Sequence, residues 1–118
     1  LPHDKVLSVM TRSRAIVMPS VCRETFGLVA YEAMIAAGLP CIVSDVGDAA
    51  SFVRSKGLGE VFSAGNAESL SAAMVNMLDP DVYSRYRGAV EKADFSCLEK
   101  TAYVERLIGI YDQLMAKL

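Results

Sequence analysis

Residues 15–44 read AIVMPSVCRETFGLVAYEAMIAAGLPCIVS, and this stretch decides the fold. Two short apolar runs, residues 15–18 and 40–44, flank a segment of good helix formers at 28–37. That segment ends at Gly38, the usual kind of residue just past a helix C-terminus. The second run is apolar on both of its faces, as in a strand that helices cover on either side. The order strand, helix, strand predicts two parallel strands joined by a right-handed crossover.

The same alternation continues on both sides of this unit. Apolar spacing predicts a helix over residues 4–12. Downstream, Asp48 is predicted to cap a short helix through Val53, and residues 60–62 read as a third strand. The chain is therefore predicted to be an α/β protein with a Rossmann-like βαβαβ parallel sheet.

After residue 63 the pattern predicts only helices, so residues 64–118 are expected to form a helical C-terminal part. Asn66 is predicted to cap a helix to about residue 78, and Asp79-Pro80 to open another to about residue 92. Ser96 and Glu99 have the spacing of a capping box, which predicts a last helix to about residue 117. Two helix faces are predicted to be apolar, one made of Leu70, Ala73, Met74 and Met77 and the other of Val104, Leu107, Ile108, Tyr111, Leu114 and Met115.

Composition narrows the classes of function. The chain has 118 residues, 53% of them hydrophobic, with 12 basic and 14 acidic residues. Scattered basic residues argue against a nucleic-acid partner, and no segment has the ~20 apolar residues of a membrane span. Three cysteines without a CxxC pair favour a reducing cytoplasm, and Cys41 is interpreted as a buried filler. His3 is the only histidine, so neither a metal site nor a catalytic His is predicted.

The chemistry is concentrated in residues 19–40. This segment forms the turn at the carboxyl end of a parallel strand, where open α/β sheets bind ligands. Seven residues separate Glu24 from Glu32, so the two carboxylates can hold opposite ends of an extended ligand. The backbone N–H groups of Phe26, Gly27 and Leu28 form a seat for diphosphate at the helix N-terminus. Thr25 either contacts phosphate or caps the helix. Carboxylates accept hydrogen bonds from sugar hydroxyls, and backbone N–H groups hold phosphate. The site therefore suits a ligand in which a sugar is joined to a diphosphate.

This segment resembles the E-x7-E signature of the retaining glycosyltransferases of family four, also called group 1, which have the two-domain GT-B fold. The resemblance covers essentially the whole chain. One departure is local: relatives tend to carry Gly-Gly-x-Pro-Glu after the second strand, whereas residues 47–51 read GDAAS. The matching residues are Pro19, Ser20, Glu24, Phe26, Gly27, Leu28, Glu32, Ala33, Met34, Gly38 and Pro40, followed by Ile42, Val43, Ser44 and Gly47.

The resemblance implies a role for each site residue. Glu24, the residue assigned to catalysis, is expected to contact hydroxyls of the transferred sugar. The backbone of residues 26–28 is expected to meet the sugar and diphosphate, and Glu32 to hold the ribose. The family transfers a hexose from a nucleotide-diphosphate sugar with retention, and no cofactor or metal is expected. The Arg and Lys that stabilise the departing diphosphate have no counterpart here, and Arg23 is interpreted as a loop charge.

The resemblance also implies what residues 1–118 are: the second half of the C-terminal, donor-binding domain of a GT-B enzyme. The mean hydropathy of +0.30 agrees with half of a larger core. The chain alone is expected to bind a donor with little or no turnover and to need an N-terminal domain or a partner chain. The acceptor is unknown. The expected location is the cytoplasm, with any peripheral contact to the inner membrane made by the absent region.

Two other classes of function remain open from the residues. The first is a non-catalytic binding or assembly module whose sheet a partner chain completes. The second is a different GT-B enzyme, such as a nucleotide-sugar epimerase or a phosphorylase. A flavodoxin-like domain without this donor site is the remaining structural alternative, but such a domain does not require glutamate at both position 24 and position 32.

Overall fold

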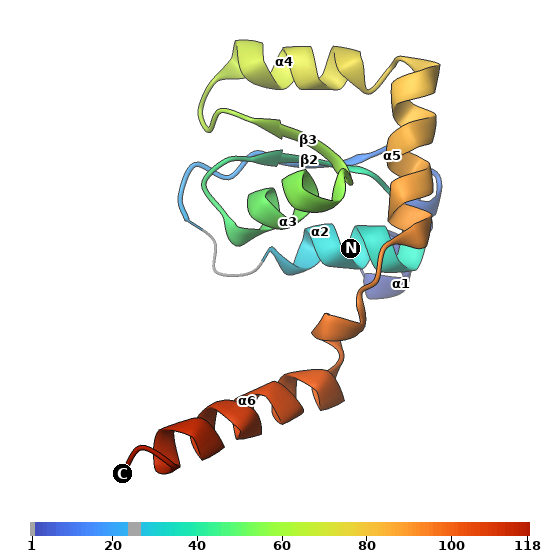
Figure 1. Cartoon of the computed structure of the whole chain (residues 1–118). Helices are drawn as coiled ribbons and strands as arrows, with labels where there is room; N and C mark the ends of the chain where they lie inside the picture. Colours follow the sequence, from blue (N-terminus) through green and yellow to red (C-terminus); the bar gives the residue numbers. More distant parts are fainter. Residues whose placement is uncertain (1, 24–26) are drawn as a thin grey trace.

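The computed structural model describes residues 2–23 and 27–118 (Figure 1). Three parallel strands, β1 (Ile16–Met18), β2 (Cys41–Ser44) and β3 (Gly59–Phe62), form one sheet in the order β1-β2-β3. Helix α2 (Leu28–Ala37) joins β1 to β2, and helix α3 (Asp48–Lys56) joins β2 to β3. The predicted βαβαβ sheet is therefore confirmed, with strand boundaries within one residue of those expected.

The other helices surround or leave this sheet. Helix α1 (His3–Thr11) precedes β1, and α4 (Ala67–Asn76) and α5 (Pro80–Lys92) follow β3. A 3-10 turn, η1 (Ser96–Leu98), leads into the last helix, α6 (Lys100–Met115). In Figure 1, α2 and α3 lie on one side of the sheet and α4 on the other, while α5 runs along one end.

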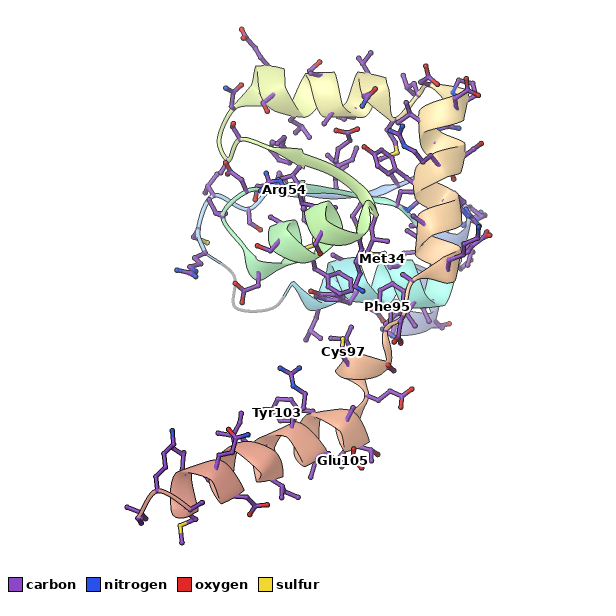
Figure 2. All side chains as sticks on the ribbon, in the orientation of Figure 1. Met34, Arg54, Phe95, Cys97, Tyr103 and Glu105 are labelled. Atoms are coloured by element: carbon purple, nitrogen blue, oxygen red, sulfur yellow. The ribbon has the colours of Figure 1, made fainter. Side chains whose placement is uncertain are left out.

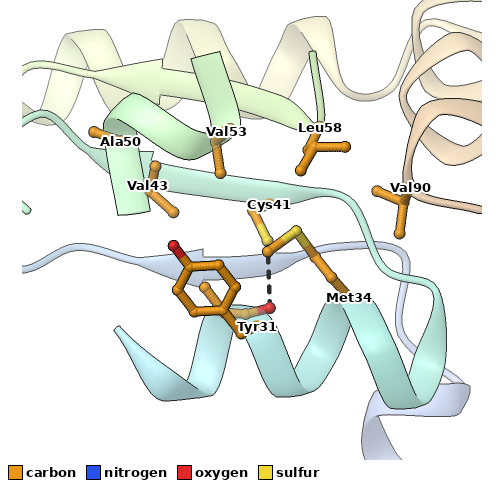
Figure 3. Close-up of a cluster of buried hydrophobic side chains, with 9 residues drawn as sticks. Tyr31, Met34, Cys41, Val43, Ala50, Val53, Leu58 and Val90 are labelled. Atoms are coloured by element: carbon orange, nitrogen blue, oxygen red, sulfur yellow. Dashed lines mark hydrogen bonds between the residues drawn. The ribbon is translucent and has the colours of Figure 1, made fainter. Parts of the chain in front are cut away.

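One core fills the space between the sheet and helices α2 and α3 (Figure 3). Tyr31 and Met34 of α2 pack there against Cys41 of β2 and Leu58. The Cys41 thiol is fully buried, and burial raises its pKa to about 12. A thiol that stays protonated is a poor nucleophile, so the interpretation of Cys41 as a filler is confirmed.

A second core covers the opposite face of β2 and β3. Ile42 and Phe62 pack there against Ala73 and Met77, with Leu70 at the edge. All four residues of β2 are buried, because each face of this strand has a helix against it. The predicted apolar face of α4 is correct except for Met74, which is 49% exposed.

Two sequence predictions about helix ends are wrong. Asp48 does not cap α3, because Gly47 occupies the N-cap position and Asp48 is the first helical residue. The capping box of Ser96 and Glu99 does not form. Instead, the backbone N–H of Ser96 donates to Asp94 Oδ1 at 2.8 Å, and residues 96–98 make the separate turn η1.

Helix α6 extends away from the sheet, which gives the molecule principal extents of 54 × 30 × 30 Å (Figure 1). It has no buried residue. Its predicted apolar face forms, yet Val104, Ile108 and Leu114 on it are between 42% and 55% exposed.

Candidate functional site

The candidate site lies where β1 ends and the chain turns into α2. Both β1 and β2 point their carboxyl ends toward this edge, because the two strands are parallel. Open α/β sheets bind ligands at such an edge. Of the residues predicted to line it, Glu24, Thr25 and Phe26 fall outside the described part of the chain, so their roles stay predictions.

Gly27 opens helix α2 in a conformation that favours glycine. Its φ of 67° and ψ of 44° lie in the left-handed region, where a side chain would be strained. Its carbonyl accepts the N–H of Ala30 at 3.0 Å, which starts the helical hydrogen bonding. The N–H groups of Leu28 and Val29 precede this first bond and have no partner inside the helix.

The N-terminus of α2 is also electrostatically open to an anion. The first turn of α2 contains no acidic residue, and no side chain among the described residues caps it. Free N–H groups and the helix dipole together attract negative charge. The predicted seat for diphosphate at Gly27 and Leu28 therefore has a suitable backbone, although no described contact tests its occupant.

A narrow hollow lies between the ends of β1 and β2, next to the start of α3. It is lined by Met18, Ser20, Val43, Ser44, Gly47 and Ala49. The loop after β2 is fixed at its far side, because Asp45 Oδ1 accepts the N–H of Ala64 at 3.0 Å. Residues 47–51, which depart from the family pattern, thus form the start of α3, and Gly47 and Ala49 line the hollow.

Glu32 lies just over one turn into α2. Its side chain is 34% exposed, so the side chain is partly covered by its neighbours and partly accessible to solvent. It lines a hollow of about 450 Å³ whose other walls are Leu28, Tyr31, Ile35 and Leu98. A carboxylate held at the edge of an apolar hollow can accept hydrogen bonds from ligand hydroxyls.

The carboxylate of Glu32 has a partner that the sequence did not indicate. His3 Nε2, from the start of α1, lies 3.1 Å from Glu32 Oε1. His3 is the only histidine, so the sequence predicts no metal site or catalytic role for it and gives it no partner. The 28 residues between them carry no periodic signal that would pair His3 with Glu32.

Two arginines that precede the candidate site, Arg12 and Arg14, make local contacts. Arg12 Nε donates to the carbonyl of Ser8 at 3.2 Å, within its own helix end. Arg14 Nε donates to the carbonyl of Met77 at 3.1 Å, and its guanidinium lies 3.9 Å from the centre of the Tyr83 ring. Both groups are therefore engaged in local structure rather than directed to the edge of the sheet.

Neither a metal-ion site nor a membrane-spanning helix is found in the described part of the chain. Within residues 2–23 and 27–118, no group of His, Cys, Asp and Glu is arranged to hold a metal ion. None of the helices in this part of the chain is long and apolar enough to cross a membrane.

The fold and the site together define a Rossmann-like α/β domain with a crevice at the carboxyl ends of its strands. The sequence model of the family described as glycosyl transferases group 1 matches residues 1–93, which is most of the chain. The chain therefore belongs to the group 1 glycosyltransferases.

A solved structure supports the same relationship. Sucrose-phosphate synthase from Thermosynechococcus elongatus superimposes with a TM-score of 0.70 at 28% sequence identity. The match covers 100% of this chain and 29% of the synthase, so the chain corresponds to a minor part of that protein. No curated protein sequence matches the chain significantly.

Proposed function

We propose that this chain forms the donor-binding half-site of a retaining glycosyltransferase of family four. In this proposal residues 1–118 are the second half of the C-terminal domain of a GT-B enzyme. The donor is a nucleotide-diphosphate sugar, from which a hexose is transferred to an acceptor. Membership of group 1 supports the reaction class. The chain spans 29% of the synthase that it resembles, which supports assigning turnover to a larger assembly rather than to these residues alone.

The observation that carries the proposal is the geometry of α2. Gly27, in the left-handed conformation, begins the helix with no side-chain cap from the described residues, and Glu32 follows five residues later. At ~1.5 Å per residue, these two positions lie about 7 Å apart along the helix axis. A nucleoside diphosphate separates its β-phosphate from its ribose hydroxyls by a comparable distance. One helix can therefore hold both ends of the nucleotide part of the donor.

In this proposal each predicted site residue takes the role that the likeness to the family implies. The backbone at Phe26, Gly27 and Leu28 receives the diphosphate, and Thr25 either joins it or caps the helix. Glu32 accepts hydrogen bonds from the ribose hydroxyls, and Glu24 from hydroxyls of the hexose during transfer.

Departure of the diphosphate builds up negative charge, which the N–H groups and dipole of α2 stabilise. This electrostatic stabilisation requires no metal ion. The additional cations that the family uses for this purpose would come from residues outside these 118.

The test is a calorimetric titration of the chain with UDP, ADP and GDP, which identifies the nucleoside diphosphate that binds most tightly. Hydrogen bonds from hydroxyls to a carboxylate contribute about 1.5–3 kcal/mol, so Glu32→Ala should weaken binding by at least about tenfold. Glu105→Ala is the matched control, because Glu105 is an exposed glutamate on α6 (Figure 2). An affinity unchanged by Glu32→Ala would count against the proposed ribose contact.

A further inference from the structure

The contact between His3 and Glu32 joins two helices at the candidate site. His3 Nε2 on α1 lies 3.1 Å from Glu32 Oε1 on α2, close enough for a hydrogen bond to the carboxylate. We propose that His3 is a positioning residue, which holds the Glu32 carboxylate in the orientation that receives the ribose of the donor. This inference rests on the proposed function of Glu32.

The helices that carry the two side chains are fixed against each other. Met10 of α1 is buried together with Ala33 of α2 and Leu39, and Val6 and Leu7 pack around them. Ala33 directly follows Glu32, so the backbone at this point of α2 sits on α1. The imidazole of His3 therefore reaches Glu32 from a rigid base rather than from a loop.

The ion pair itself contributes little to the stability of the fold. The His3 side chain is 71% exposed and that of Glu32 is 34% exposed. Exposed pairs of this kind are screened by water and commonly contribute less than ~1 kcal/mol to stability. The buried residues between α1 and α2 are sufficient to hold the helices together. The contact can thus be removed without unfolding the domain, which makes its role testable.

The geometry leaves the carboxylate free to bind a ligand while His3 is in place. A carboxylate offers roughly four acceptor positions on its two oxygens. His3 approaches Oε1, so Oε2 remains available to the ribose hydroxyls. A neutral imidazole that carries its hydrogen on Nε2 donates the same bond as an imidazolium does, so the role does not depend on the charge of His3.

Fixing this side chain lowers the cost of binding. Glutamate has three side-chain torsions, and a partly exposed glutamate samples several rotamers. Ordering such a side chain on binding costs affinity, and a partner that orders it beforehand removes this cost. Without His3, the ribose hydroxyls would have to select one orientation of Glu32 at the expense of several-fold in affinity.

The test compares His3→Ala, His3→Gln and the control Lys5→Ala, an exposed position on the same helix. Each is titrated with the tightest-binding of UDP, ADP and GDP, and with the 2′,3′-dideoxy form of that nucleotide. His3→Ala should weaken the ribonucleotide roughly three- to tenfold and leave the dideoxynucleotide within about twofold. Glutamine also carries an N–H donor, so His3→Gln should restore most of the affinity, and Lys5→Ala should change neither ligand.

Each alternative result is decisive. Equal weakening of both nucleotides by His3→Ala would show general damage to the site and overturn the positioning role. An unchanged ribonucleotide affinity in His3→Ala, with a loss in Glu32→Ala, would overturn this inference alone. An unchanged affinity in Glu32→Ala would overturn the proposed ribose contact and the inference with it. No binding of any of the three diphosphates by the chain would overturn the proposed function as well.

Discussion

Gly59 allows β3 to approach β2 closely. It pairs with Cys41 in the register of the sheet, and its φ is 156°. A Cβ added at this position would lie 1.8 Å from the carbonyl oxygen of Cys41, which is far inside contact distance. The carbonyl belongs to the backbone of the central strand and cannot move aside. Glycine is therefore required here for β2 and β3 to pair.

We expect Gly59→Ala to destabilise the domain by about 3 kcal/mol or more, because the two strands must separate to accept the methyl group. Gly57→Ala is the matched control. Gly57 also has a positive φ, of 64°, but a Cβ there would meet nothing within 4 Å. It should cost only the ~1–2 kcal/mol of the backbone conformation. Urea denaturation of both variants measures the difference, and equal losses would show that backbone conformation alone makes glycine necessary at position 59.

At the same scale, the sequence could identify Glu32 but not His3. Glu32 stands in a local pattern of glycine, small residues and a second carboxylate, and a pattern of this kind can be read along the chain. The partnership of His3 with Glu32 depends on how α1 packs across α2, and that packing rests on Met10 and Leu39 rather than on anything next to His3. Contacts between distant residues of this kind leave no local signal.

Among the elements, helix ends could be predicted where one side chain had no competitor. Asn66 Oδ1 accepts the N–H of Ser69 at 2.9 Å, and Asp79 accepts from Asp81 and Val82, as the sequence predicts. The capping box of Ser96 and Glu99 does not form, because Asp94 Oδ1 accepts the Ser96 N–H that the Glu99 side chain would accept in such a box. Two candidate caps within three residues compete, and their spacing alone does not decide the outcome.

Replacing the cap of α4 should have a measurable cost. Asn66→Ala removes the acceptor for the Ser69 N–H and should lower the free energy of unfolding by about 1 kcal/mol. Asn66→Asp keeps a side-chain oxygen at the same place and should retain most of the stability. Ser96→Ala should change stability by less than about 0.5 kcal/mol, since the predicted box is not formed. Chemical denaturation of the three variants checks this, and a loss at Ser96 as large as that at Asn66 would contradict the observed helix start.

For the whole molecule, the order of strands and helices followed from the sequence because each apolar run is short and clearly bounded. The position of α6 could not be predicted in this way. Its apolar residues recur at helical spacing, and such spacing indicates an apolar face without saying what the face contacts. In the structure α6 leaves the domain beyond η1, with Cys97 and Tyr103 at the junction (Figure 2). Stability should therefore be divided unequally between the sheet domain and the last helix.

A matched pair of leucine truncations tests this division. Leu58 is completely buried between β3 and α3, whereas Leu114 of α6 is 55% exposed. Leu58→Ala leaves a cavity in the core and should cost about 2–5 kcal/mol. Leu114→Ala removes a side chain that touches little in this chain, and it should change stability by less than about 0.5 kcal/mol. Thermal unfolding followed by circular dichroism at several protein concentrations measures both. A comparable loss in Leu114→Ala that is independent of concentration would mean that α6 packs back onto its own domain in solution, because a contact between copies would weaken on dilution.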